Sequence, residues 1–270
     1  MEQLSFHNVS LDYVREGGRV AALRGLDLAV AAGESVAIIG PSGCGKSSLL
    51  RMACGLLQPT TGSVELDGTP LTAPRRDTAL ILQDFGLLPW ATVLANAELG
   101  LKVRGIARTE RRQRAMEALE LVGLQDFVRA YPGELSGGMQ QRLALARALA
   151  LDVRLLLMDE PLSALDALLR ERIQDLLLDL WQRESYAQLL VTHSIEEAVF
   201  LGQRIVIMSA RPGHTVGVVK NPEAGEPDYR LTDTFHVRCD AVREILRTEV
   251  AAQEAADAET AVAREEASSR

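Results

Sequence analysis

The sequence predicts an α/β domain with a mostly parallel sheet, because short apolar runs alternate with helical patterns along most of the chain. Its 270 residues are 47% hydrophobic and 24% charged, which is the range of a globular protein with a sizeable core. The longest unbroken apolar run covers five residues, 28–32, and is far too short to cross a bilayer. These three observations exclude a disordered chain, a fibrous repeat and a membrane-spanning protein.

The first strand is predicted at the apolar run 35–39, and a helix can continue over 48–57 after a glycine-rich turn. A second short run, 78–82, also has the composition of a buried strand. The stretch that follows contains helical patterns and no convincing strand, so we expect a helical insertion over about residues 90–150. Its three helical patterns cover 93–103, 109–122 and 138–150.

After the insertion the alternation of strand and helix resumes. Runs of Leu, Ile and Val bounded by polar residues predict three further strands, at 155–158, 188–192 and 204–208. Between the first two, apolar side chains recur at three- and four-residue steps from Leu165 to Trp181, as in a helix with one buried face.

The composition changes near residue 215, so we expect one domain over 1–215 and a C-terminal extension over 216–270. Residues 244–270 hold seven acidic and three basic side chains, a net charge of −4, which is half of the total of −8. Eight alanines among the last twenty residues suit an exposed helix, and partial disorder is an equal alternative. We expect this acidic tail to be a solvated end of the chain.

Charge and cysteine content exclude further classes of protein. A net charge of −8 argues against a protein that binds nucleic acid through phosphate contacts, so no nucleic-acid partner is expected. The three cysteines form no CxxC pair and predict neither a disulfide framework nor a zinc site. The N-terminus lacks a basic start followed by an apolar run, so we expect no secretory signal and a soluble, cytoplasmic protein.

A phosphate-binding motif follows the first predicted strand directly. Residues 40–47 read GPSGCGKS and fit G-x-x-x-x-G-K-[ST], the P-loop; the alternative is a glycine-rich turn without a ligand. Glycines let backbone N–H groups surround phosphate oxygens, Lys46 can reach the β- and γ-phosphates, and the Ser47 hydroxyl can bind Mg²⁺. The residues expected to hold the nucleotide are Gly40, Pro41, Ser42, Gly43, Cys44, Gly45, Lys46, Ser47 and Ser48.

Two carboxylates end the strand predicted at 155–158. Asp159 and Glu160 lie at its C-terminal edge, which is where open α/β sheets place their ligands. Asp159 can hold Mg²⁺ through water, and Glu160 can polarise an attacking water. The alternative, a cap on the next helix, becomes weaker beside a P-loop.

Residues 135–142, LSGGMQQR, resemble the LSGGQ signature of the ATP-binding cassette (ABC) ATPases, with Met139 where glutamine or glutamate is commoner. Gln83 resembles the Q-loop glutamine, 163–166 the D-loop, His193 the switch histidine, and Tyr13 the aromatic residue that stacks on adenine. Singly, Gln83, His193 and Tyr13 could equally be core or surface residues. Their joint order and spacing carry the resemblance, which covers roughly residues 2–215.

The resemblance implies a P-loop NTPase core with an antiparallel β subdomain and a helical subdomain, acting on ATP with Mg²⁺. It implies catalytic roles for Glu160, His193, Gln83 and Lys46, and metal contacts for Ser47, Gln83 and Asp159. Two copies would form a head-to-tail dimer on ATP binding, each nucleotide lying between one P-loop and the other copy's signature. The nucleotide contacts outside the P-loop would be Tyr13, Ser136, Gly137, Gly138 and Asp166.

Helix caps offer structural readings of the same residues. Ser136 fits the N-cap of the helix that begins with the signature. Ser194 stands where the family usually has aspartate, and 194–197 reads as a capping box with Glu197 at its third position. Ser163 and Asp166 match a capping box as well, which would make Asp166 partly structural.

One cassette without fused membrane helices, coiled coils or cysteine clusters resembles the separate ATPase subunit of a bacterial importer. The residues 87–90 (LLPW), together with 195–200 and 209–213, resemble the nitrate, sulfonate and taurine group. The alternative is a non-transport ABC ATPase acting as a switch. The importer reading implies membrane permease partners, an indirect solute-binding protein, and a peripheral place on the cytoplasmic face of the bacterial inner membrane. Residues 87–90 would then dock a membrane subunit, unless they pack into the core.

Overall fold

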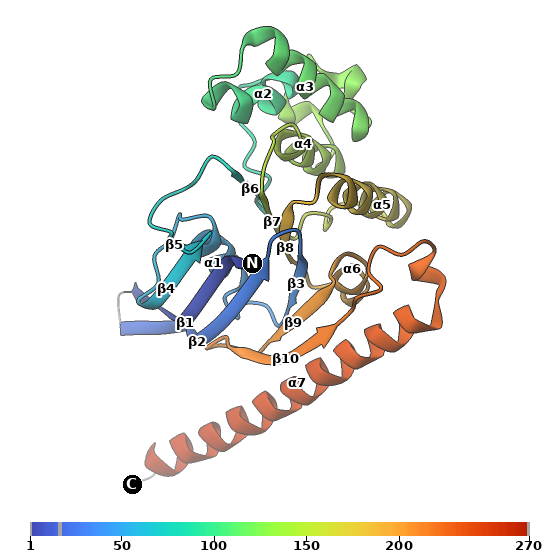
Figure 1. Ribbon diagram of the computed structural model, residues 1–270. Helices are drawn as coiled ribbons and strands as arrows, with labels where there is room; N and C mark the ends of the chain where they lie inside the picture. Colours follow the sequence, from blue (N-terminus) through green and yellow to red (C-terminus); the bar gives the residue numbers. More distant parts are fainter. Residues whose placement is uncertain (1, 16–17, 269–270) are drawn as a thin grey trace.

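The computed structural model describes residues 2–15 and 18–268, which form two β-sheets with helices packed around them (Figure 1). One sheet has four strands in the order β2-β1-β4-β5, and the other has six in the order β10-β9-β3-β8-β7-β6. The expected α/β class, with a mostly parallel sheet and an antiparallel β subdomain, is confirmed.

The four-stranded sheet is antiparallel throughout. Its members are β1 (Glu2–Arg15), β2 (Gly18–Ala31), β4 (Thr61–Leu66) and β5 (Thr69–Pro70). The face that includes Leu4, Phe6 and Leu26 is buried in the same core as the first helix. Register shifts interrupt the pairing of β1 with β2, so neither long strand shows a regular alternation of apolar and polar residues.

The six-stranded sheet is parallel except at one edge, where β10 pairs antiparallel with β9. Every residue of β3, β7 and β8 is buried, which explains why these strands read as continuous apolar runs. The predictions at 35–39 and 204–208 match the observed bounds, those at 78–82 and 155–158 differ by one residue at one end, and the one at 188–192 is shifted by one residue at both ends. The strands are β3 (Ser35–Ile39), β6 (Thr78–Ile81), β7 (Leu155–Asp159), β8 (Ala187–Val191), β9 (Arg204–Met208) and β10 (Thr215–Lys220).

Among the helices that flank this sheet are α1 (Lys46–Ala53), α5 (Ala167–Glu184) and α6 (Ile195–Leu201). The prediction that the first helix runs over 48–57 is wrong at both ends. Helix α1 begins at Lys46 and stops before Gly55, whose φ of +74° turns the chain. A Cβ at Gly55 would lie 2.5 Å from the Ala73 carbonyl carbon, so this tight turn requires glycine.

The helical insertion stands at one end of the molecule (Figure 1). It contains α2 (Val93–Val103), α3 (Arg108–Leu121) and α4 (Gly137–Leu149), joined by the 3₁₀ turns Gln125–Phe127 and Pro132–Glu134. The three predicted helices match these within one residue. Their buried side chains belong to the same core cluster as one face of the six-stranded sheet, so the insertion is packed onto the sheet rather than tethered to it.

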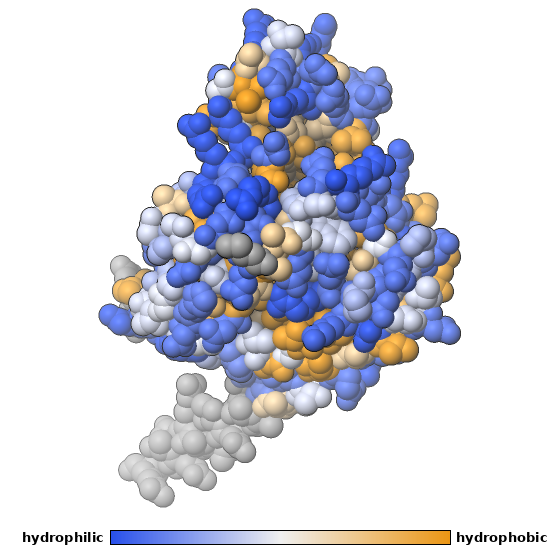
Figure 2. All heavy atoms as spheres, in the orientation of Figure 1, coloured by the Kyte–Doolittle hydropathy of each residue, from blue (hydrophilic) through white to orange (hydrophobic). Residues whose placement is uncertain are grey.

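The chain after residue 215 continues the same core. It supplies β10, a 3₁₀ turn at Tyr229–Leu231 and α7 (Asp233–Ser268). Tyr229, Phe235 and Val242 are buried in the main core cluster, so the compositional change near residue 215 does not coincide with a break in packing. The face shown in Figure 2 is mostly hydrophilic, with apolar side chains over β10 and the adjoining part of α7. Among residues 2–15 and 18–268, no helix is long and apolar enough to span a membrane.

Candidate active site

The P-loop joins the end of β3 to the start of α1. Gly43 and Gly45 have φ values of +78° and +104°, a conformation that side chains rarely adopt, and Gly45 is the N-cap of α1. A Cβ on Gly40 would lie 2.8 Å from the Met208 carbonyl oxygen, so packing against β9 also requires glycine there. The loop therefore presents the N-terminus of α1 to a pocket, which is the geometry that binds phosphate.

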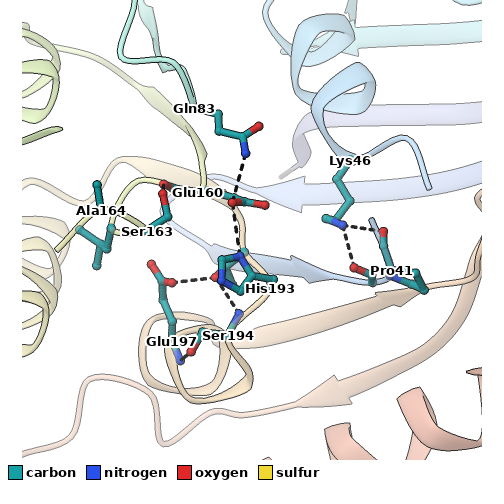
Figure 3. Close-up of polar contacts among 12 residues, drawn as sticks. Pro41, Lys46, Gln83, Glu160, Ser163, Ala164, His193, Ser194 and Glu197 are labelled. Atoms are coloured by element: carbon teal, nitrogen blue, oxygen red, sulfur yellow. Dashed lines mark hydrogen bonds and ion pairs between the residues drawn. The ribbon is translucent and has the colours of Figure 1, made fainter. Parts of the chain in front are cut away.

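Lys46 lies inside this turn (Figure 3). Its Nζ donates hydrogen bonds to the carbonyls of Gly40 at 2.7 Å and Pro41 at 2.8 Å, and the residue is 7% exposed. Cys44 points into the core, where burial raises the pKa of its thiol, and its Sγ accepts a contact from Lys46 Nζ at 3.8 Å. The ammonium group is thus held among the loop's own peptides.

A pocket of about 280 Å³ opens beside the loop. It brings together residues from the antiparallel sheet, the P-loop, and the ends of β6 and β7. The lining residues are Tyr13, Val20, Ala22, Ser42, Gly43, Gly45, Lys46, Ser47, Ser48, Gln83, Glu160 and Arg211.

Tyr13 reaches the pocket from β1, where its hydroxyl lies 2.9 Å from the Ser48 Oγ. Arg211, from the turn after β9, also lines the pocket and donates from Nε to the Gly43 carbonyl at 3.1 Å. Arg211 was expected only as part of the subgroup pattern at 209–213, with no role of its own. Its proximity to the P-loop depends on a turn far away in the chain, for which the local sequence carries no signal.

Asp159 and Ser47, the two residues expected to hold a metal with Gln83, are brought together. Asp159 ends β7 and is 6% exposed, and Ser47, at the start of α1, lies beside its carboxylate. Burial raises the pKa of Asp159, an effect that the nearby Ser47 hydroxyl partly offsets. In the described part of the chain no three His, Cys, Asp or Glu side chains cluster as a metal site.

Glu160 lies at the centre of the polar contacts in Figure 3. Its Oε2 accepts a hydrogen bond from Gln83 Nε2 at 3.3 Å and lies 3.3 Å from His193 Nδ1. Gln83 follows β6 and His193 follows β8, while Glu160 follows β7, so three neighbouring strands deliver the group to one edge of the sheet. The structure thus brings together the four expected catalytic residues, with Lys46 across the pocket.

Ser136 and Asp166 cap helices. The Ser136 hydroxyl accepts from Met139 N at the start of α4, as expected, with Gly137 and Gly138 in the first turn. Asp166 accepts from Leu169 N at the start of α5, so it is an N-cap itself and the expected capping box with Ser163 is wrong. None of these four residues, Ser136, Gly137, Gly138 and Asp166, lines the pocket beside the P-loop.

The capping box expected at 194–197 is half correct. Glu197 N donates to the Ser194 hydroxyl, but the Glu197 carboxylate does not return to Ser194 N. Instead it accepts a 2.7 Å hydrogen bond from the Thr192 hydroxyl, and Thr192 Oγ1 accepts from Ser194 N. Glu197 is 4% exposed, and this burial raises its pKa.

The segment 87–90 lies at the surface beside Gln83. Trp90 is 75% exposed, so the alternative that this tryptophan packs into the core is wrong. Leu87, in contrast, is partly buried and packs against the main core cluster. The fully buried amide of Asn96 holds the segment, donating to the carbonyls of Leu88, Ala91 and Thr92 and accepting from Leu88 N. Asn96 was not predicted from the sequence, because its role depends on this loop folding back over α2.

Comparison with known proteins identifies relatives of this arrangement. A family model described as ABC transporter matches residues 23–163. The taurine import ATP-binding protein TauB of Pseudomonas aeruginosa UCBPP-PA14 is 47% identical over 253 residues, covering 87% of this chain and 96% of that protein. The nitrate import ATP-binding protein NrtD of Synechocystis sp. PCC 6803 is 47% identical over 201 residues, covering 74% and 76%. Among solved structures, the ATP-binding cassette MJ0796, a dimer in a post-hydrolysis state bound to ADP and Pi, has a TM-score of 0.75 at 35% identity and covers 80% of this chain and 98% of its own.

Proposed function

The chain belongs to the ABC transporter family of ATP-binding ATPases, and we propose that it powers a bacterial importer. The relatives named for taurine import and nitrate import favour an importer over a non-transport switch. The observation that carries the site proposal is the position of the Glu160 carboxylate, between Gln83 and His193 and on the wall of the pocket that also holds Lys46.

In this proposal Glu160 is the general base, accepting a proton from the water that attacks the γ-phosphate. Gln83 and His193 both contact the same oxygen, Oε2, and so fix the direction of the carboxylate. Lys46 neutralises charge on the phosphates, which the N–H groups of the P-loop surround. Tyr13 provides an aromatic ring on the wall of the pocket, suited to a nucleobase.

The side chains around the pocket fit a magnesium ion bound together with ATP. Ser47 and Gln83 line the pocket and offer a hydroxyl and an amide oxygen, and the carboxylate of Asp159 lies beside Ser47. Mg²⁺ prefers oxygen ligands and takes only a few of them from protein, completing its shell with phosphates and water. When bound, it would neutralise negative charge on the transferring phosphate.

We further propose a head-to-tail homodimer on ATP binding. Ser136, Gly137 and Gly138 start a helix whose N–H groups can bind phosphate, yet they lie outside the pocket of their own chain. A second copy can supply them to that pocket, with Asp166 at the same junction. The dimeric MJ0796 cassette is a structural precedent for such a pairing.

The proposed transporter partners are membrane permease subunits, reached through the exposed segment 87–90, and indirectly a solute-binding protein. In this proposal the chain lies peripherally on the cytoplasmic face of the inner membrane, bound to the permease subunits. The names of the relatives favour a small cargo, either the nitrate ion or a zwitterion that carries a sulfonate group, as taurine does.

Reconstitution tests this function. The full chain, co-purified with candidate permease subunits in proteoliposomes, should drive uptake of taurine, an alkanesulfonate or nitrate only with ATP and the solute-binding protein. ATP hydrolysis that never couples to any solute, and a chain that recruits no permease, would favour the switch alternative.

A further inference from the structure

Helix α4 carries one buried amide whose contacts lie on other elements. Gln141 is 1% exposed, and it stands on the turn of α4 that follows the signature residues. Its Nε2 donates to the backbone carbonyl of Glu160 at 3.1 Å, and its Oε1 accepts from Ala164 N at 2.9 Å. Both ends of the amide are therefore used to hold the segment that follows β7.

The residue that Gln141 holds has an unusual backbone. Glu160 has φ of +49°, in the left-handed region, where a side chain other than glycine costs of the order of 1–3 kcal/mol unless its surroundings enforce it. Its N–H donates to the Val191 carbonyl at 2.9 Å, and its carbonyl also accepts from the Ser163 hydroxyl at 3.1 Å. Gln141 is the contact that links this strained peptide to the helical insertion.

We propose that Gln141 is a positioning residue for Glu160: it keeps the Glu160 peptide in its left-handed conformation and so keeps the carboxylate at Gln83 and His193. The inference rests on the proposed role of Glu160 as general base. Without the Gln141 bond the peptide can relax towards the common right-handed conformation, which turns the side chain away from the pocket. A displacement of about 1 Å at a reacting group can cost roughly 100-fold in rate.

Two substitutions separate this role from simple packing. Gln141→Met keeps the length of the side chain and removes its hydrogen bonds to Glu160, Ala164 and, at 3.5 Å, the Ser163 hydroxyl. Gln141→Glu keeps an acceptor for Ala164 N, and it is assayed at a pH above the raised pKa that burial gives the new carboxyl, because only the ionised carboxylate cannot donate to the Glu160 carbonyl. The matched control is Gln174→Met on α5, because Gln174 is also a buried glutamine, 6% exposed, and its bond is to Arg230, away from the pocket.

The measurements are kcat and KM for ATP hydrolysis by the full chain, ATP affinity by titration calorimetry, and melting temperature. Both Gln141 variants should lower kcat by about tenfold to 100-fold while KM and ATP affinity change less than about twofold. Gln174→Met should leave kcat unchanged. If Gln141→Met fails to fold, the kcat of Gln141→Glu tests the positioning role.

A kcat close to wild type in a folded Gln141 variant overturns the inference, as does a fall in melting temperature alone. Glu160→Gln, measured beside them, tests the general base separately. If that variant stays active, the proposed role of Glu160 is wrong; if it is inactive while Gln141 variants are normal, only the positioning role is wrong.

Discussion

The carboxylate oxygen Oε2 of Glu160 lies 3.3 Å from Nδ1 of His193. The two residues follow adjacent parallel strands, in which Asp159 pairs with Val191, so the register of β7 and β8 places them at the same height on the sheet edge. This contact joins the strand that ends in the acidic pair to the strand that ends before α6. It is the geometric basis of the first prediction.

Glu160→Gln should lower the rate of ATP hydrolysis at least ~100-fold, the usual scale for losing a general base. The amide has nearly the same shape and can still contact Gln83 and His193, so ATP binding should persist and an ATP-bound dimer should accumulate. Turnover assays with the membrane subunits and size-exclusion chromatography with ATP measure the two effects. Near-normal turnover contradicts the assignment.

Lys46→Met should weaken ATP binding strongly and change the fold little. The variant loses two hydrogen bonds to the P-loop carbonyls, each worth about 1–3 kcal/mol, but it also removes a charge that is costly to bury. We therefore expect a melting temperature within a few degrees of wild type. Circular dichroism and ATP titration check this, and an unfolded variant would indicate that Lys46 chiefly holds the loop together.

Trp90→Ala should weaken co-purification with permease subunits while sparing the isolated chain. Exposed substitutions usually change stability by no more than about 0.5 kcal/mol, whereas an interface tryptophan often contributes 2 kcal/mol or more. Because Trp90 is 75% exposed, its truncation leaves no core cavity. A pull-down run beside thermal unfolding separates the two effects, and unchanged assembly rejects docking through this residue.

Arg147→Met should loosen the segment that follows Gln83. Arg147 on α4 donates to the carbonyls of Gly86 at 2.6 Å and Phe85 at 2.7 Å, two residues with positive φ. We expect faster hydrogen exchange at the 85–90 amides and a loss of roughly 2 kcal/mol in the free energy of unfolding. The control Arg142→Met removes a bond to the Val122 carbonyl and should leave exchange at 85–90 unchanged; equal effects of both variants would disprove a local role.

Glu197→Gln should change how stability depends on pH. Burial raises the pKa of Glu197 above its unfolded value of about 4.3, although the bond from Thr192 and the charge of Arg170 work against this. The native state therefore holds the proton more tightly, and the resulting stability, complete below the unfolded pKa, is lost as pH rises through the native pKa. Glutamine stays neutral and still accepts from Thr192, so the melting temperature of the variant relative to wild type should increase from pH 5 to pH 8. A constant difference across this range contradicts the prediction.

The strands of the parallel sheet were predictable because they are buried on both faces. Burial on both sides excludes polar side chains, so 35–39 and 204–208 stand out as apolar runs with sharp ends. The long strands β1 and β2 were not predicted from their own residues, since register shifts break the alternation on which such a prediction depends. The antiparallel subdomain was expected only through the resemblance to the ABC ATPases.

The local chemistry of the chain was sufficient to predict the residues that act through short motifs. Phosphate binding needs a glycine-rich turn and a helix start within a few residues, so 40–48 carries its own signal, as does the N-cap Ser136. Only the tertiary structure decided which distant groups complete the site. Gln141 donates to the Glu160 carbonyl, Arg147 to a carbonyl of the 85–90 segment, and Arg211 to the Gly43 carbonyl. Each of these side chains donates to a backbone carbonyl, a group that every residue has, so no sequence pattern identifies the partner. Only the packing of the helical insertion and the β9 turn against the sheet brings donor and acceptor together.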